Sequence, residues 1–255
     1  MAAIHQAAAE GYTAKAEAYI RGRPEYPAAV LDWLRDDLAL GAGRTVLDLG
    51  AGTGKFLPHL RATGAAVLAV EPVAAMRVQL AQHNPGIEAM AGTAEDIPLA
   101  DGAVDAVVCA QAFHWFANPA ALAEIHRVLK PGGRLGLIWN VRDESVAWVA
   151  GLTRIMAPHE AGVPRYHSQA WRRLFPAEGF GPLRERHFAN AHTGPAEQVI
   201  LERILSVSFI AALPPPEQNA VAAEIRKVIA TTPELAGKSE VAFPYDTAAF
   251  SSVRK

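Results

Sequence analysis

One short segment constrains this chain of 255 residues more than any other, because it joins an apolar run to three closely spaced glycines. It reads VLDLGAGTGKF and extends from Val46 to Phe56. The apolar run predicts a buried strand, and the glycines permit a tight turn that a ligand can approach closely before a helix begins. The segment therefore indicates a ligand site at the end of a strand in an α/β fold.

The spacing of the glycines separates two classes of cofactor. The dinucleotide fingerprint is G-x-G-x-x-G. Here the glycines are Gly50, Gly52 and Gly54, and Lys55 occupies the place of the fingerprint's third glycine. Asp48, at the end of the strand, would repel a pyrophosphate but would attract an ammonium group. The pattern therefore favours a ligand with an ammonium group over NAD.

The next apolar run, AVLAVE, ends at Glu71, which lies 21 residues after Gly50. An acid at this distance accepts hydrogen bonds from ribose hydroxyls in nucleotide-binding folds of this kind. Glu71 by itself supports either NAD or S-adenosylmethionine. The alternative is that Glu71 is a solvated acid at the end of a strand and binds no ligand.

Short Val- and Leu-rich runs alternate with helical patterns along the first half of the chain. The predicted strands cover 45–50, 66–71, 105–110 and 134–140, with a weaker candidate at 87–90. The predicted helices cover 55–63, 73–83 and 119–130, and Pro131-Gly132-Gly133 is expected to end the last of them. Alternation of this kind predicts an α/β fold with a doubly wound, mostly parallel sheet.

This pattern divides the chain into three regions. Residues 1–43 are expected to form N-terminal helices that act as a lid, and residues 44–140 form the cofactor-binding α/β core. Residues 141–255 are expected to form cap helices together with the last strands of the sheet. The candidates for those strands lie near 183–188 and 240–245.

Five segments carry a resemblance to a known family. They are VLDLGAGTGKF, AVEPVAAM, GTAEDIPL, VDAVVCAQAFHWF and VLKPGGRLGLIWNVRD. In this order they resemble the successive motifs of class I S-adenosylmethionine-dependent methyltransferases, over about Tyr19 to Asp143. AQAFHWF and IWNVRD, preceded by RGRPEYP, are similar to trans-aconitate methyltransferase-like proteins. The resemblance implies a seven-stranded sheet, S-adenosyl-L-methionine as cofactor and S-adenosyl-L-homocysteine as product.

The resemblance also implies roles for the residues of the first two motifs. Gly50, Gly52 and Gly54 would line the methionine portion of the cofactor. Asp48 would lie near its ammonium group, directly or through water. Glu71 would bind the ribose hydroxyls.

Further along the chain, the resemblance implies that Thr93-Ala94-Glu95 faces the adenine edge. Many relatives have aspartate where Thr93 stands, so Glu95 or Asp96 is the candidate to contact the exocyclic amine. Ala110 and Gln111 would close the pocket over the sulfonium. In the N-terminal segment, Arg23 would belong to a lid over the cofactor, together with Tyr19 and Tyr26.

Two residues are candidates for contact with the methyl acceptor. His114 follows the fourth predicted strand and could take a proton from a hydroxyl, pair with a carboxylate, or make a local hydrogen bond only. Arg142 follows the fifth predicted strand and could hold an acidic acceptor, or could pair with Asp143 or Glu144. We therefore expect transfer of a methyl group to a carboxylate or hydroxyl oxygen of a small molecule.

Other functions remain as alternatives. They are N- or C-methylation of a metabolite, binding of S-adenosylmethionine without catalysis, and an NAD-dependent oxidoreductase. Methyl transfer is an in-line displacement on an activated cofactor, so it requires alignment rather than a nucleophilic residue or a metal. The sequence shows no H-x-x-x-H motif, and we expect no metal site.

Composition limits the partners. The net charge of −2 argues against nucleic acid, which usually requires a basic surface. Ala110-Gln111-Ala112-Phe113 also replaces the Asn/Asp-Pro-Pro-aromatic turn of enzymes that methylate exocyclic amines of nucleic acids. No run approaches the roughly 18 apolar residues of a membrane-spanning helix. A single cysteine, Cys109, fits a reducing compartment, so a cytoplasmic protein without a membrane partner is expected.

Overall fold

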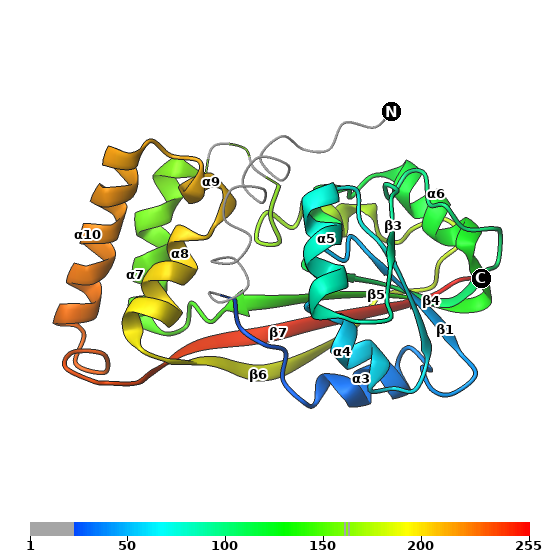
Figure 1. The fold of residues 1–255 in the computed structure, drawn as a ribbon, viewed down its shortest axis with the longest axis horizontal. Helices are drawn as coiled ribbons and strands as arrows, with labels where there is room; N and C mark the ends of the chain where they lie inside the picture. Colours follow the sequence, from blue (N-terminus) through cyan, green and yellow to red (C-terminus); the bar gives the residue numbers. More distant parts are fainter. Residues whose placement is uncertain (1–22, 161, 163) are drawn as a thin grey trace.

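The computed structural model of the protein describes residues 23–160, 162 and 164–255. Within these residues the strands form one seven-stranded sheet in the order β3-β2-β1-β4-β5-β7-β6 (Figure 1). The strands are β1 Thr45–Leu49, β2 Ala66–Val70, β3 Ala89–Met90, β4 Val104–Ala110, β5 Leu129–Arg142, β6 Arg184–Gly194 and β7 Val241–Val253. The expected α/β class is confirmed.

The first five strands pair in parallel, whereas β7 pairs antiparallel with both β5 and β6. The sheet is therefore mixed. The strands of the parallel part are apolar and buried on both faces, as in β4, where six of the seven residues are buried. The crossovers contain the helices α4 Leu57–Arg61, α5 Ala74–His83 and α6 Pro119–Val128. Strand direction thus brings the carboxyl ends of the first five strands to one edge of the sheet.

Helix α6 is shorter than predicted. It begins at Pro119, with the Asn118 side chain accepting a hydrogen bond from the Ala121 amide, and it ends at Val128. Residues 129–133, part of which was expected to continue the helix or to end it, belong to β5. The pairing of β4 with β5 shifts register here, since Val104 pairs with Leu129 and Ala106 with Arg134. The proline and glycines form an irregular stretch of the strand instead of a helix stop.

The last two strands are longer than their sequence signals. β6 extends to Gly194 and β7 to Val253, beyond the predicted ends at 188 and 245. β7 lies between two partners and is buried along Thr247–Ser252, where every residue except Phe250 is small. Such a run has little hydrophobic signal, and pairing on both sides determines its conformation.

The cap is built from α7 Ala147–Met156, α8 Arg203–Leu205, α9 Ser208–Ala211 and α10 Pro215–Thr231. Figure 1 shows these helices together at one end of the molecule, beyond the long ends of β5, β6 and β7. They form a second core with Phe243 and Tyr245 of β7. A short 3-10 helix covers Ala170–Leu174.

At the N-terminal side, α3 covers Val30–Asp36 and packs Trp33 and Leu34 into the core. The first of the two expected N-terminal helices falls outside the described residues, as does Tyr19. In the part of the chain that the structure describes, no helix has the length and apolar character needed to cross a membrane.

Candidate active site

The glycine loop after β1 lies at the carboxyl edge of the sheet. Gly50, Gly52 and Gly54 adopt positive φ angles of 74°, 58° and 81°. A Cβ atom on Gly50 would lie 2.9 Å from the Cβ of Ala112, and one on Gly54 would lie 2.9 Å from Leu80 of α5. At Gly52 the nearest atom to such a Cβ would be 3.8 Å away, so this position faces open space. Gly50 and Gly54 thus allow close packing, and Gly52 leaves room for a ligand.

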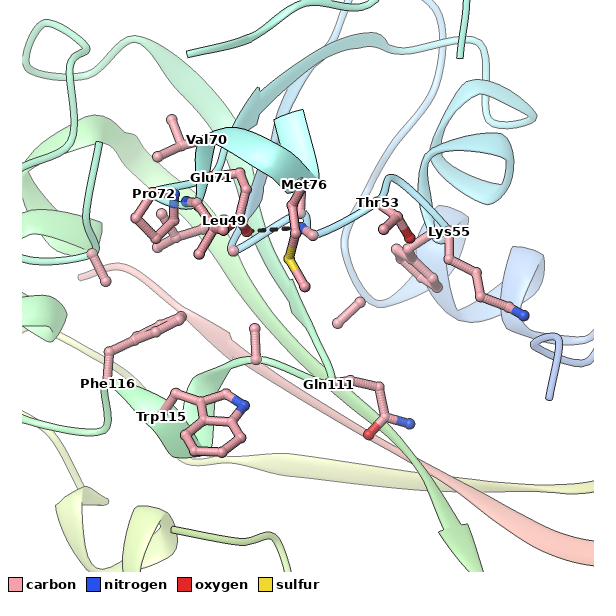
Figure 2. Close-up of a pocket in the computed structure, with 18 of the residues that line it drawn as sticks. Leu49, Thr53, Lys55, Val70, Glu71, Pro72, Met76, Gln111, Trp115 and Phe116 are labelled. Atoms are coloured by element: carbon pink, nitrogen blue, oxygen red, sulfur yellow. Dashed lines mark hydrogen bonds between the residues drawn. The ribbon is translucent and has the colours of Figure 1, made fainter. Parts of the chain in front are cut away.

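A first cavity of about 180 Å³ opens beside this loop. Its walls are the loop itself, the residues that follow β2, a loop at 92–95, and the residues after β4. Figure 2 shows Glu71 and Met76 on one side of it and Gln111, Trp115 and Phe116 on the other. Of the residues predicted to bind the cofactor, those that line this cavity are Arg23, Gly50, Gly52, Glu71, Thr93, Ala94, Glu95, Ala110 and Gln111.

Glu71 is buried at the edge of this cavity, with 4% of its surface exposed. Its Oε2 accepts a hydrogen bond from the Gly52 amide at 2.9 Å, and its Oε1 accepts one from the Val73 amide at 2.8 Å. Burial raises the pKa of Glu71, and these two amides oppose the rise. Each carboxylate oxygen retains a lone pair after these bonds, so Glu71 can still accept hydrogen bonds from ribose hydroxyls.

Asp48 lies beneath the loop and is not part of the cavity wall. Both of its carboxylate oxygens are buried, and neither has a hydrogen-bond partner among the described residues. Burial raises the pKa of Asp48 to about 8, and the negative charge of Glu71 adds to the rise. A positive charge placed nearby would stabilise this carboxylate.

The loop at 92–95 forms the third wall of the cavity. Thr93, Ala94 and Glu95 line it, whereas Asp96 does not. The Asn118 amide nitrogen donates a hydrogen bond to Oε1 of Glu95 at 2.7 Å, so the cap residue of α6 fixes this side chain. Of the two acids considered for the adenine amine, Glu95 is the one beside the cavity.

Comparison with known proteins gives the family. A family profile described as a methyltransferase domain matches residues 47–137, from β1 to β5. A methyltransferase-like protein of Schizosaccharomyces pombe is 40% identical over 239 residues, 93% of each chain. A methyltransferase of Mycobacterium tuberculosis is 40% identical over 230 residues, 90% of each chain. The chain belongs to the S-adenosylmethionine-dependent methyltransferases.

Solved structures of methyltransferases share the fold of this methyltransferase. A structure described as a type II methyltransferase from Anaeromyxobacter dehalogenans has a TM-score of 0.64 at 23% identity, covering 91% of this chain and 96% of its own. The geranyl diphosphate C-methyltransferase of Streptomyces coelicolor, solved with S-adenosylhomocysteine, has a TM-score of 0.50 at 18% identity. It covers 89% of this chain and 79% of its own. The cofactor of this methyltransferase is S-adenosylmethionine.

The first cavity fits this cofactor. The buried carboxylate of Asp48 lacks a partner among the described residues and matches an ammonium group, and Gly52 leaves space for the methionine portion. The acceptor oxygens of Glu71 match the two ribose hydroxyls. When bound, the cofactor supplies a methyl group activated as a sulfonium.

A second cavity of about 90 Å³ adjoins the first. The two share several lining residues, among them Gln111, Trp115 and Asn140. The second cavity is further lined by His114, Arg142 and residues of the cap. His114 and Arg142, the two candidates for contact with the acceptor, therefore line the same cavity.

His114 is a neutral side chain in this cavity. The indole N–H of Trp139 donates to its Nδ1 at 3.1 Å. Burial lowers the pKa of His114 to about 3, and the positive charges of Arg23 and Arg165 contribute. Because an indole N–H can only donate, Nδ1 must be the unprotonated nitrogen and Nε2 must carry the hydrogen.

Arg142 is the last residue of β5 and is 6% exposed. Its Nε is buried without a hydrogen-bond partner among the residues that the structure covers, and no ion pair with Asp143 or Glu144 is formed there. Burial, together with the nearby charges of Arg203 and Arg165, lowers the pKa of Arg142 to about 10. The guanidinium is thus placed to receive an anion.

Arg165 and Arg203 line the same cavity, and no pattern in the sequence indicated a role for them. Arg165 follows a loop and forms an ion pair with Glu160 at 3.2 Å, while Arg203 begins α8 and is buried. Neither belongs to a motif. The only signal that could have indicated them is a basic residue on the side of a cap element that faces the cavity. That side is known only once the tertiary arrangement is known.

The N-terminal segment contributes to both cavities. Arg23 lines both, and its carbonyl accepts a hydrogen bond from Lys55 at 2.6 Å. Lys55 also forms an ion pair with Glu25 at 2.9 Å, and the Asn190 side chain donates to the Glu25 carbonyl at 2.8 Å. Lys55, which stands where the dinucleotide fingerprint has glycine, therefore holds this segment across the glycine loop.

Proposed function

We propose that this methyltransferase transfers the methyl group to a carboxylate oxygen of a small acceptor bound in the second cavity. One combined observation carries the proposal. His114 is neutral with its Nδ1 already bonded to Trp139, and buried arginines line the same cavity.

The chemistry of the acceptor follows from the state of His114. A hydroxyl acceptor must lose its proton as the new O–CH₃ bond forms, so it requires a base within reach. Nε2 of His114 carries a hydrogen, and Nδ1 accepts the bond from Trp139. A carboxylate is already ionised at neutral pH, so its oxygen can attack the methyl carbon while the bond to sulfur breaks, and no proton moves.

The charge of the cavity supports an anionic acceptor. Arg142 and Arg203 are both buried, and Arg165 lines the same space. A guanidinium presents a planar pair of N–H donors that matches a carboxylate. An acid bound there would offset several positive charges that otherwise repel one another, as the lowered pKa of Arg142 indicates.

Relatives give further support. A malonyl-[acyl-carrier protein] O-methyltransferase of Methylococcus capsulatus is 44% identical over 124 residues, 44% of this chain. Its name describes methyl transfer to oxygen on a malonyl group, which carries a carboxylate. The similarity of AQAFHWF and IWNVRD to trans-aconitate methyltransferase-like proteins agrees with an acidic acceptor.

The proposal is tested by supplying the protein with S-adenosylmethionine and a panel of small mono-, di- and tricarboxylic acids, phenols, alcohols and amines. Release of S-adenosylhomocysteine is measured together with the methylated product by mass spectrometry. We expect methyl esters of one or more acids. Turnover of phenols, alcohols or amines without turnover of any acid would contradict the proposal while leaving the methyltransferase activity in place.

A further inference from the structure

We propose that Trp139 is a positioning residue, because its indole N–H holds His114 in the tautomer that presents an Nε2–H donor to the acceptor. The inference rests on the proposed function for the identity of the acceptor. It assigns His114 the role of a hydrogen-bond donor to the oxygen of the carboxylate that does not attack.

Trp139 cannot easily turn away from His114. It lies on β5, is 1% exposed, and packs between other aromatic rings. Its ring centroid is 4.7 Å from that of Trp171, 5.1 Å from Tyr166 and 5.9 Å from Phe250. The direction of its N–H is therefore fixed by the core and not by solvent.

The ring that receives this hydrogen bond is also held in place. His114 lies in the 3-10 helix η1, Phe113–Trp115, which follows β4 directly. Phe113 is fully buried and anchors this turn, and the His114 ring lies 5.0 Å from that of Trp115. The imidazole is thus held on both sides, with Nδ1 toward Trp139. Among the residues described, none accepts a hydrogen bond from Nε2 of this cavity-lining side chain.

The cavity by itself would favour the opposite tautomer. Arg23 and Arg165 are close enough to lower the pKa of His114, and Arg142 and Arg203 line the same space. Positive charges attract a nitrogen lone pair and repel an N–H dipole. Without Trp139 the ring would place its lone pair toward the arginines, so the indole overrides the electrostatic preference of the site.

The consequence is a donor that remains in place as the acceptor arrives. A carboxylate held by guanidinium groups would find one more N–H, from His114, for its second oxygen. This bond would form when the acceptor binds and would be kept in the transition state. It would therefore act on acceptor binding, measured by KM, more than on kcat.

The decisive experiment is nitrogen NMR of the histidine ring in the full-length protein. We expect His114 to show a protonated Nε2 and an unprotonated Nδ1 in the parent. In Trp139→Phe the ring should shift toward the Nδ1–H tautomer. The matched control is Trp171→Phe, which removes a neighbouring indole of the same cluster whose N–H donates to the Tyr166 carbonyl at 3.3 Å. Its His114 tautomer should equal that of the parent.

Kinetics with the best acid from the panel give the second readout. Trp139→Phe should raise the acceptor KM roughly five- to twentyfold with kcat within about twofold, the pattern of binding lost equally from the ground state and the transition state. His114→Leu should show the same rise, and His114→Gln, which keeps an N–H donor, should recover most of it. Trp171→Phe should leave KM unchanged.

An Nδ1–H tautomer in the parent would overturn the proposal, as would a Trp139→Phe variant with unchanged tautomer and KM. An equal effect of Trp171→Phe would also overturn it, because it would reduce Trp139 to packing. If the parent methylates no acid, the proposed function fails by that result alone. The tautomer comparison between the two tryptophan variants then still decides whether Trp139 positions His114.

Discussion

The first cavity is built mainly around backbone turns at the carboxyl edge of the sheet, whereas the second gathers charged side chains from the end of β5, the loop at 164–167 and the cap. The first is formed by the turns that follow β1, β2 and β4 and by the loop at 92–95. The second joins His114, Arg142 and Arg165 with Arg23 and Arg203, which line both cavities. One site depends mainly on backbone conformation, and the other depends on side-chain identity.

This difference has a physical consequence for function. A glycine turn at the end of a parallel strand presents amides and open space whatever the acceptor is, so it suits a cofactor that stays the same. Side chains from the cap can change without disturbing the parallel strands, because the cap packs in a second core with α7, α10 and the first residues of β7. The two cavities should therefore respond separately to mutation.

The largest effect is expected from Gly52→Val. The position has a φ of 58° and faces the cavity, so a branched side chain would strain the turn and fill the space of the methionine portion. Cofactor affinity should fall about a hundredfold or more, because strain and lost space each cost on the order of 1–3 kcal/mol. Calorimetric titration with S-adenosylmethionine measures this.

The control for that variant is Gly132→Val. Gly132 has a φ of 74°, a Cβ atom placed on it would meet nothing within 4 Å, and it lines neither cavity. Gly132→Val carries the same cost of placing a branched residue at a positive φ angle, but it leaves the ligand cavity unchanged. Equal loss of cofactor binding in both variants would mean that Gly52 acts through folding and not through the cavity.

The next effect concerns Glu71→Ala. It removes acceptors for the ribose and also frees the amides of Gly52 and Val73. S-adenosylmethionine and S-adenosylhomocysteine should both bind more weakly by roughly 1.5–3 kcal/mol, as is typical for hydrogen bonds to a charged group. The acceptor KM at saturating cofactor should not change. If the cofactor affinity is unaltered, Glu71 does not bind the ribose hydroxyls.

A smaller effect is expected from Arg142→Gln. Arg165 and Arg203 remain in the cavity, so the acceptor KM should rise roughly ten- to thirtyfold, with little change in kcat or in cofactor affinity. The matched control is Arg226→Gln on α10, which removes an exposed ion pair with Glu197 and should leave KM unchanged. If cofactor affinity falls as much as KM rises, the two cavities are one coupled site and the comparison fails.

The same contrast explains what could be predicted from the sequence. Gly50, Gly52 and Glu71 were found because a strand, a turn and a fixed spacing are local signals, and all three lie at the first cavity. Arg165 and Arg203 were not found, because the pairing of β5 with β7 and the packing of the cap bring them to the site. The length of β7 was missed for the same reason, since all of its buried residues at 247–252 except Phe250 are small.

The smallest expected effect at the first cavity is the release of a proton when the cofactor binds. The pKa of Asp48, about 8, lies above its ordinary value of 3.8, so the free protein holds a proton there that the unfolded chain gives up. Its contribution to stability is therefore fully present below about pH 4 and is lost as the pH rises toward 8.

Binding of an ammonium group beside Asp48 would favour its ionised form, so cofactor binding at pH 7 should release close to one proton. Titration in buffers of different ionisation enthalpy measures this number. Asp48→Asn, which keeps the shape of the side chain, should release none and should bind the cofactor more weakly. If the parent also releases none, Asp48 is ionised before the cofactor arrives or does not lie near its ammonium group. In either case Asp48 would not be a protonated acid that the cofactor's ammonium group ionises.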